Sequence, residues 1–127
     1  MIFGIGTDIV QIPRIEKIMQ KYGATFPKKI LSIIELEQLK SLPLNKRNSF
    51  LAKRFAAKEA VSKALGIGIT KRNLHFQDIT ILNDELGKPY AQINSLKFVD
   101  FNTFEVNLSI SDDYPIAMAF AIISRLK

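Results

Sequence analysis

The segment from about Asn45 to Leu65 constrains the fold of this chain more than any other part of the sequence. It reads as one long helix that ends at Gly66. A helix with apolar side chains nearly all the way round is a buried helix, and small alanines let neighbouring elements approach it closely. We therefore expect the rest of the chain to pack around this segment. Its apolar residues are Phe50, Leu51, Phe55, Ala56, Ala57, Ala60, Val61, Ala64 and Leu65.

The residues before this helix predict one strand and two shorter helices. Ile2–Ile9 is short, apolar and interrupted by glycine, which is typical of a strand. Pro13–Tyr22 begins with proline at a position that helices favour and carries apolar residues along one side. Ser32 followed by Glu35 is a capping-box pattern, which predicts a helix from there to about Leu42.

After Gly68 the pattern changes from helix to strand. Phe76–Ile81 has the apolar spacing of a strand, and Asp84–Pro89 has the composition of a turn. Phe104–Ile110 alternates apolar and polar residues, as a strand with one solvated face does. Asp112–Pro115 then turns the chain into a last strand, Ile116–Ile123. Helices come early and antiparallel strands late, so the expected fold class is α+β.

The length and charge of the chain limit its organisation and its partners. The chain has 127 residues, which suits a single domain over residues 1–127. Its net charge is +6 and its pI is about 9.7, which favours polyanionic partners such as nucleic acid, anionic membrane, nucleotide phosphates or an acidic protein. The charge does not choose among these, and a solvated basic surface without a special partner is also compatible with it.

The residue types that are missing exclude several kinds of chemistry. The chain has no cysteine, which rules out disulfides and thiol nucleophiles, and His75 is its only histidine, which argues against a histidine triad or a zinc cluster. The N-terminus does not resemble a signal peptide, and the apolar run Ile116–Ile123 is too short to span a bilayer. We expect a soluble, cytoplasmic protein.

Two acidic residues in different elements stand out as candidate metal ligands. Glu59 lies four residues before Lys63 on the long helix, so the two can form an ordinary ion pair within the helix. Asp8 follows the first strand and can simply cap the next helix. The functional alternative is that both carboxylates bind Mg²⁺, which takes one or two carboxylates and completes its shell with water and phosphate oxygens. Such a pair alone is a weak signal.

The glycines and the basic residues each have a structural and a functional reading. Gly4 and Gly6 lack the third glycine of a dinucleotide fingerprint, and Gly66 and Gly68 are not followed by the residues of a Walker loop. Close strand packing and helix ends are the commoner roles of such glycines. On the first helix, the cations Arg14, Lys17 and Lys21 form either a solvated face or a docking surface for an acidic helix.

Several motifs of the chain resemble the holo-acyl-carrier-protein synthases, the small members of the phosphopantetheinyl transferases. The resemblance runs essentially from end to end. The pairing of the opening motif with the central-helix motif makes it specific. The matching segments are Gly4–Val10 with Arg14 and Ile15, Arg54–Ala60 with Lys63–Gly66, Gly87-Lys88-Pro89 and Ser109-Ile110-Ser111.

The resemblance implies a fold, an assembly and an activity. The expected subunit is α+β, with an antiparallel sheet packed on a long central helix, and it forms a homotrimer with active sites between subunits. The expected reaction moves 4'-phosphopantetheine from coenzyme A to a serine of apo acyl carrier protein. Asp8 and Glu59 would hold Mg²⁺ against the diphosphate of coenzyme A, and Lys63 would lie near that diphosphate. Neither nucleic acid nor a membrane is an expected partner.

Further roles follow from the resemblance position by position. The residues expected to contact coenzyme A are Lys46, Arg47, Arg54, Phe55, Lys58, Ser62, Gly66, Gly87, Lys88, Pro89 and Asp112. The residues expected to dock the carrier protein are Arg14, Ile15, Lys21 and Lys29.

Two positions depart from the family pattern. Asp112 stands where the family usually has a histidine, and Ile67 stands where it often has a threonine. An aspartate there would repel the phosphates of coenzyme A or reach toward the metal ion. These changes keep an alternative open, namely a degenerate, non-catalytic basic domain that binds coenzyme A or another polyanion.

Overall fold

The computed structural model describes residues 1–69, 73–94, 97–98 and 102–126, and within them it shows an α+β fold. This confirms the predicted fold class. The elements, in chain order, are β1 (Ile2–Gln11), α1 (Ile12–Tyr22), α2 (Thr25–Ile30), α3 (Ile33–Ser41), α4 (Leu44–Ala64), the 3-10 turn η2 (Phe76–Asp78), β2 (Ile79–Asn83), β3 (Pro89–Ile93), β4 (Phe104–Asp113) and β5 (Ile116–Arg125).

The strands form two separate antiparallel sheets. The larger sheet has the order β1-β5-β4, and the smaller one is the hairpin β2-β3. β5 lies between the first strand of the chain and β4, so the two chain ends lie side by side, and the Arg125 N–H donates to the Met1 carbonyl at 3.0 Å. In the larger sheet, Asp8 is paired in register with Ala119.

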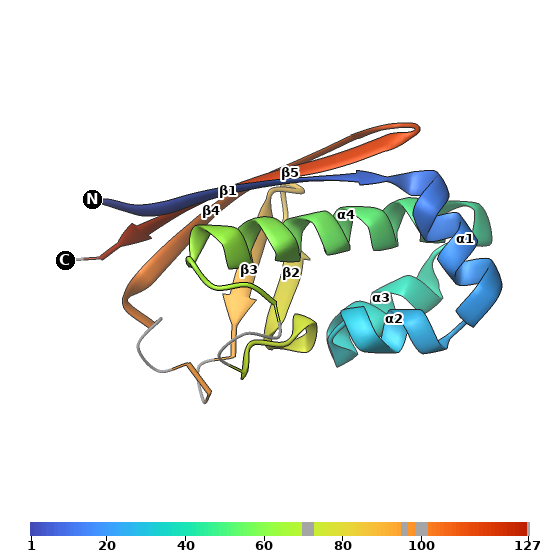
Figure 1. Ribbon diagram of the computed structural model, residues 1–127, viewed down its shortest axis with the longest axis horizontal. Coiled ribbons are helices and arrows are strands. Elements are labelled where there is room, and N and C mark those ends of the chain that lie inside the picture. Colours follow the sequence, from blue (N-terminus) through green and yellow to red (C-terminus); the bar gives the residue numbers. More distant parts are fainter. Residues whose placement is uncertain (70–72, 95–96, 99–101, 127) are drawn as a thin grey trace.

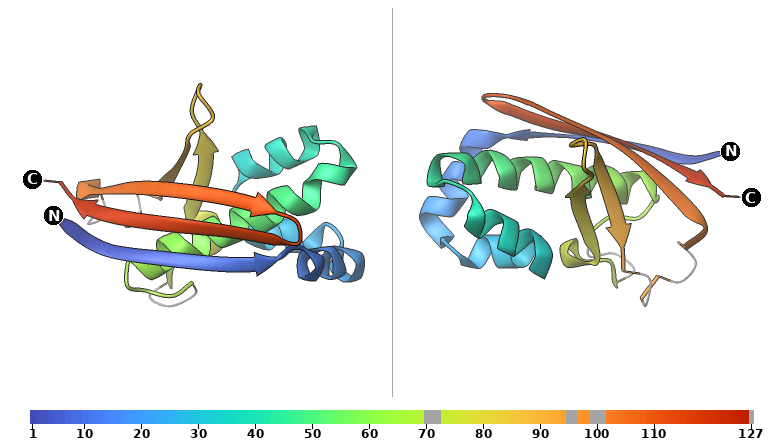
Figure 2. Two further views of the ribbon diagram at one scale, coloured as in Figure 1. Left: turned by 90° about the horizontal axis from the view of Figure 1, so that it is seen from above. Right: turned by 180° about the vertical axis from the view of Figure 1, so that it is seen from behind.

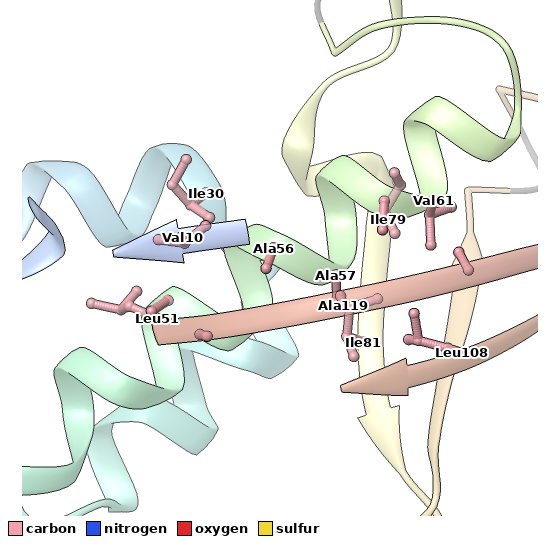
Figure 3. Close-up of a cluster of buried hydrophobic side chains, with 14 of the residues drawn as sticks. Val10, Ile30, Leu51, Ala56, Ala57, Val61, Ile79, Ile81, Leu108 and Ala119 are labelled. Atoms are coloured by element: carbon pink, nitrogen blue, oxygen red, sulfur yellow. The ribbon is translucent and has the colours of Figure 1, made fainter. Parts of the chain in front are cut away.

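The long helix α4 is the centre of the molecule. It runs along one face of the β1-β5-β4 sheet, while the β2-β3 hairpin crosses its other side and α1, α2 and α3 gather near its first turns (Figure 1; Figure 2). The strand face that meets α4 is lined by alanines of β5, and the facing residues of α4 are alanines too. Because small residues face each other, the sheet and the helix approach closely, and larger side chains fill the flanks of the core (Figure 3).

The opposite face of the larger sheet is unusually apolar. Ile5, Ile9, Met118 and Phe120 are 61%, 65%, 42% and 36% exposed. Ile9 and Met118 are direct cross-strand partners in the register of β1 and β5. A patch of large apolar side chains on two adjacent strands is a usual sign of an interaction surface.

The structure agrees with most of the predicted elements and corrects three. The capping box is present, because Glu35 accepts a hydrogen bond from the Ser32 N–H at 2.9 Å and the Ser32 side chain faces the N3 backbone. Phe76 was expected in a strand but belongs to η2, and the strand begins at Ile79. The short helix α2 and the strand β3 were not predicted. No helix in the described part of the chain is long and apolar enough to cross a membrane.

Candidate active site

Two glycines let β1 lie directly against the last turns of α4. A Cβ atom added at Gly6 would lie 2.0 Å from the Ala60 carbonyl oxygen, and one at Gly4 would lie 2.0 Å from that of Ala64. No side chain fits at either position, so the close packing of backbone on backbone requires glycine. This contact fixes where the next residue on the same strand face, Asp8, lies relative to α4.

Asp8, Glu59 and Lys63 come together at this crossing. The Lys63 Nζ donates to the Thr7 carbonyl at 2.9 Å and to the Asp8 Oδ1 at 3.2 Å. Glu59 lies one helical turn before Lys63 and is half-buried, as Asp8 is. Within the described residues, Lys63 is ion-paired with Asp8 across the two elements and not with Glu59 along the helix. The plain intrahelical pair is therefore not what the structure contains.

The carboxylates of Asp8 and Glu59 are both partly buried, and their negative charges repel each other. Burial raises the pKa of Glu59, and the negative charge of Asp8 raises it further, while Lys63 lowers it. Burial also raises the pKa of Asp8. The hydrogen bond and charge of Lys63 and the hydrogen bond from the Ile9 N–H lower this pKa, but burial has the larger effect. Two half-buried acids with one ammonium leave one negative charge without compensation. A further cation would relieve this imbalance.

The donor set suits a magnesium ion that binds together with a phosphate ligand. In the part of the chain that the structure describes, no three Asp, Glu, His or Cys side chains gather as a metal site. A closed, all-protein site is therefore not what the described residues form. Mg²⁺ differs from most metals in often taking only one or two carboxylates and filling its octahedral shell with water and substrate phosphates. Asp8 and Glu59 fit that requirement.

A cavity of about 490 Å³ lies beside α4, at residues that precede Glu59 and Lys63 in the helix. It opens between α3, the first half of α4, the turn after β2 and the end of β4. Its walls combine aliphatic and aromatic side chains with two cations, one carboxylate and neutral polar groups. Such lining suits a flat heterocycle attached to a polar, charged group. The lining residues are Gln38, Ser41, Leu42, Phe50, Lys53, Arg54, Asn83, Gly87, Pro89, Ile110 and Asp112.

Arg54 is the deep cation of this cavity. It is 6% exposed, its Nη2 donates to the Asn83 Oδ1 at 2.9 Å, and its guanidinium lies 4.6 Å from the centre of the Phe50 ring. Burial lowers the pKa of Arg54, and the charge of Glu35, whose Oε2 lies 3.9 Å from the Arg54 Nε, opposes that shift. The side chain is thus fixed from several directions and presents a rigid positive group.

Asp112 stands at the β4 side of the same cavity. Its Oδ2 accepts a hydrogen bond from the Ser49 hydroxyl at 3.0 Å, and its Oδ1 lies 3.8 Å from the Lys53 Nζ. The side chains of Lys53 and Asp112 are 33% and 38% exposed, so this ion pair lies at the mouth and not in the depth of the cavity. α4 therefore holds the Asp112 carboxylate in a defined place.

Lys58 lies next to Glu59 in the sequence but in the interior of the molecule. It is completely buried, and its Nζ donates to the Ile30 carbonyl at 2.7 Å, to the Phe76 carbonyl at 3.0 Å and to the Glu35 carboxylate. Glu35 is also completely buried and accepts from the Ile81 N–H at 2.9 Å. This group, Glu35 with Lys58 and Arg54, is called the buried cluster below. It ties α2, α3, η2 and β2 to α4.

Comparison with known proteins identifies the family of this chain. Residues 4–119 match the family model of the 4'-phosphopantetheinyl transferase superfamily. The chain belongs to this superfamily. It is also 46% identical over 129 residues to the holo-[acyl-carrier-protein] synthase of Orientia tsutsugamushi (strain Ikeda), and the match covers 98% of each chain. The resemblance recognised in the sequence is confirmed.

Solved structures agree with this assignment over almost the whole chain. The holo-[acyl-carrier-protein] synthase of Neisseria meningitidis is 39% identical with a TM-score of 0.88, and the match covers 98% of this chain and 100% of that one. The synthase from Bacillus anthracis, solved in complex with CoA (3',5'-ADP), is 38% identical with a TM-score of 0.84, and the match covers 100% and 99%. The synthase of Helicobacter pylori, solved with coenzyme A, is 37% identical with a TM-score of 0.82, and the match covers 94% and 99%.

The residues assigned from the family pattern divide into two groups in space. Arg54, Gly87, Pro89 and Asp112 line the cavity. Gly66, just after the C-terminal end of α4, has a φ of 80°, and its N–H donates to the Lys63 carbonyl at 3.0 Å.

Four further family positions lie outside both places. Phe55 packs its ring on that of Phe76, with a centroid distance of 5.3 Å. Lys46 and Lys88 are exposed, and neither lines the cavity. Arg47 donates to the Leu42 carbonyl at 3.0 Å and to the Lys40 carbonyl at 3.2 Å. In a single subunit these side chains do not converge with the residues of the cavity.

Two assignments to coenzyme A binding need correction. Lys58 and Ser62 are both completely buried, so neither offers a surface to a ligand. Lys58 uses its ammonium group on three protein acceptors, and the Ser62 hydroxyl donates to the Glu59 carbonyl at 2.8 Å. On a helix that is apolar all round, spacing alone does not distinguish an inward from an outward polar residue.

The expected docking residues lie on α1 and α2, with one correction. Arg14, Lys21 and Lys29 are exposed, as docking requires, but Ile15 is only 3% exposed and packs in the core. An apolar anchor is available one turn along α1. A surface hollow of about 360 Å³ in this region is lined by Ile18, Tyr22, Thr25, Phe26 and Lys29.

Sequence reasoning missed several residues of the cavity and the role of Glu35. Phe50 was recognised only as an apolar helix residue, and neither Lys53 and Asn83, which line the cavity, nor Ser49, which binds Asp112, were singled out. Ser49 and Asp112 are 63 residues apart in the chain, and no local pattern signals such a contact. Glu35 was noticed as a helix cap, and its second task, to neutralise two buried cations, depends on the tertiary fold.

Proposed function

We propose that this chain transfers the 4'-phosphopantetheine group from coenzyme A to a serine of apo acyl carrier protein, as a holo-acyl-carrier-protein synthase of fatty acid biosynthesis. The observation that carries the proposal is the meeting of Asp8, Glu59 and Lys63 in a chain of this superfamily. Relatives of the same length and fold bear this name, and some were solved with coenzyme A. The single domain, residues 1–127, would carry the whole activity.

In this proposal Asp8 and Glu59 hold magnesium, which when bound stabilises negative charge on the diphosphate of coenzyme A. Lys63, held beside Asp8 by the Thr7 carbonyl, neutralises charge on the leaving phosphate. The carrier serine oxygen forms a bond to the phosphorus that bears pantetheine, and the bond from that phosphorus to the bridging oxygen breaks. Adenosine 3',5'-bisphosphate leaves, and the serine proton passes to a base, for which Glu59 is the candidate that lies in place.

The cavity is the proposed site of the adenosine end of coenzyme A. The side chains of Leu42, Phe50, Pro89 and Ile110 give it apolar walls that suit a purine ring. Arg54 supplies a fixed positive charge for a phosphate group. The turn that contains Gly87 contributes backbone to the same wall, in keeping with its expected place beside adenine.

We propose a homotrimer in which each active site lies between two subunits. The α4 residues that line the cavity run from Phe50 to Arg54, and Glu59 and Lys63 lie farther along the same helix, so we propose that a neighbouring subunit completes each site. The apolar face of the larger sheet, with Ile5, Ile9, Met118 and Phe120, supplies a surface for association. In the proposed trimer, the cavity of one subunit lies near the acid pair of its neighbour.

The carrier is proposed to dock on α1 and α2, near the first turns of α4 (Figure 1). Arg14, Lys21 and Lys29 give this region a positive potential that steers an acidic carrier protein toward it. The hollow that Ile18 and Phe26 line gives an apolar side chain of the carrier a place to insert. A cytoplasmic location is in keeping with these partners.

The direct test is the mass of the carrier after incubation with this chain, coenzyme A and Mg²⁺. We expect the carrier to gain one phosphopantetheine group, and we expect no gain with the Asp8→Asn variant, which keeps the size of the side chain but removes its charge. The non-catalytic alternative is not favoured, because the two carboxylates and the lysine that the chemistry needs are present together. Absence of any adduct with several acidic carriers would overturn the proposal.

A further inference from the structure

The cavity proposed to hold the adenosine end of coenzyme A carries a carboxylate, that of Asp112, at its mouth. Asp112 is fixed there by the Ser49 hydroxyl and by Lys53. The alternation of β4 points Asp112 to the same side as Ile110, which also lines the cavity. The carboxylate is therefore part of the binding surface and not of the outer face of the sheet.

The depth of the cavity and its mouth differ in chemistry. Phe50 and Arg54 lie deep, and the guanidinium of Arg54 is engaged with Asn83. The pair of Lys53 and Asp112 is about one-third exposed, so it meets the part of the ligand nearest to solvent. In the proposed pose the purine lies against the apolar walls beside Phe50, and the sugar and its substituents reach this mouth.

A carboxylate attracts a hydroxyl group and repels a phosphate. An ionised carboxylate only accepts hydrogen bonds, so it binds a ribose hydroxyl well. The carboxylate repels a phosphate that replaces this hydroxyl on the ribose. It also pairs with the Lys53 ammonium, which would otherwise bind that phosphate. The same logic lets an acidic residue select a free ribose hydroxyl in dinucleotide-binding proteins.

We propose that Asp112 is a specificity-determining residue, which accepts a hydrogen bond from a ribose hydroxyl of the donor nucleotide. This rests on the proposed function and narrows it. The chain then uses a donor with an unphosphorylated ribose, 3'-dephospho-coenzyme A, at least as well as coenzyme A itself. Asp112 discriminates at the nucleotide end of the substrate, and it takes no part in the reaction at the phosphorus.

The test compares kcat/KM for coenzyme A and for 3'-dephospho-coenzyme A, with one apo carrier protein. Asp112→Asn keeps the shape of the side chain and removes its charge. We expect it to raise kcat/KM for coenzyme A by about fivefold, the size of one like-charge contact near a surface. We expect it to lower kcat/KM for 3'-dephospho-coenzyme A, because the ribose hydroxyl then donates to a neutral acceptor instead of a charged one. The matched control is Asp113→Asn, because Asp113 is the next residue of β4, is exposed and does not line the cavity.

Calorimetric titration of both nucleotides into the wild-type protein and both variants gives a readout without turnover. The same change in the ratio of affinities is expected for Asp112→Asn and no change for Asp113→Asn. The proposal is overturned by a wild-type preference for coenzyme A greater than about tenfold, by an equal effect of Asp112→Asn on both donors, or by an equal effect of the control. If neither donor supports transfer but both bind, the proposed function fails, while the affinity ratio still decides the role of Asp112.

Discussion

Two neighbouring residues of α4, Lys58 and Glu59, belong to regions of opposite electrostatic character. Lys58 is part of the buried cluster, in which one carboxylate, Glu35, meets two cations and backbone groups use the remaining hydrogen-bonding capacity. Glu59 belongs to the acid pair, in which two carboxylates meet one ammonium, that of Lys63. The first region carries an excess positive charge inside the protein, and the second an excess negative charge at its surface.

The difference shows how to separate a structural charge from a functional one. The Lys58 ammonium has three protein acceptors and no exposure, so it has nothing left to offer a ligand. The acid pair is half-open and electrostatically incomplete, and burial raises the pKa of both of its acids. A group that the fold leaves uncompensated and accessible is where a ligand gains most by binding.

The largest expected effect is on the stability of the buried cluster. Lys58→Met would leave Glu35 as a buried carboxylate without its closest partner, so we expect a loss of about 3–5 kcal/mol in the free energy of unfolding. The matched change Lys63→Met removes the same charge at a half-exposed position and should cost less than about 1 kcal/mol. Urea unfolding of the two variants measures both values. Equal losses would remove the contrast between the regions.

The next effect is on activity at the acid pair. Glu59→Gln keeps the shape of the side chain, and we expect kcat/KM for carrier loading to fall by roughly 10²–10³ because the charge that holds the metal ion is lost. Its unfolding free energy should stay within about 0.5 kcal/mol of wild type or rise, since a like-charge contact disappears. A variant that unfolds more easily but loads carrier normally would assign Glu59 to structure.

The packing of β1 on α4 should matter mainly to the acid pair. Gly6→Ala places a methyl group against the Ala60 carbonyl, so the strand must move away from the helix, at a cost of about 1–3 kcal/mol. We expect carrier loading to fall more steeply than this destabilisation alone explains, because Asp8 moves with the strand. The neighbouring exposed change Thr7→Ser is the control. Activity lost only in proportion to the unfolded fraction would show that the position of Asp8 tolerates the shift.

The smallest expected effect concerns the exposed face of α1, which belongs neither to the buried cluster nor to the acid pair. Arg14→Glu reverses a charge on the exposed face of α1, and we expect about a tenfold rise in the KM for the carrier at low salt, with the affinity for coenzyme A unchanged. Added salt should reduce the difference. A parallel loss of coenzyme A affinity, measured by titration calorimetry, would contradict a docking surface that is separate from the nucleotide site.

The sequence predicted elements whose signal is local. The apolar surface of α4 and the capping box of Ser32 and Glu35 can be recognised from residues close together in the sequence. The six residues of α2, which include Pro27, are too few to show a helical period, and β3 begins at a proline, so both were missed.

The candidate site was only partly accessible from the sequence. Family motifs pointed to Asp8, Glu59 and Lys63, and the fold brings them together. The same motifs did not reveal that Lys58 points inward, because its partners come from α2, α3 and η2. Contacts between distant segments decide which charged residue is a ligand and which is a support.

The central claim is that Asp8 and Glu59 together bind one divalent ion at the diphosphate of coenzyme A. Electron paramagnetic resonance of free Mn²⁺, used as a probe for Mg²⁺, measures binding directly in the presence of coenzyme A. We predict one saturable ion per subunit for the wild-type protein and at least tenfold weaker binding for both Asp8→Asn and Glu59→Gln, about 1.4 kcal/mol or more. Unchanged Mn²⁺ binding in either folded variant would contradict the account.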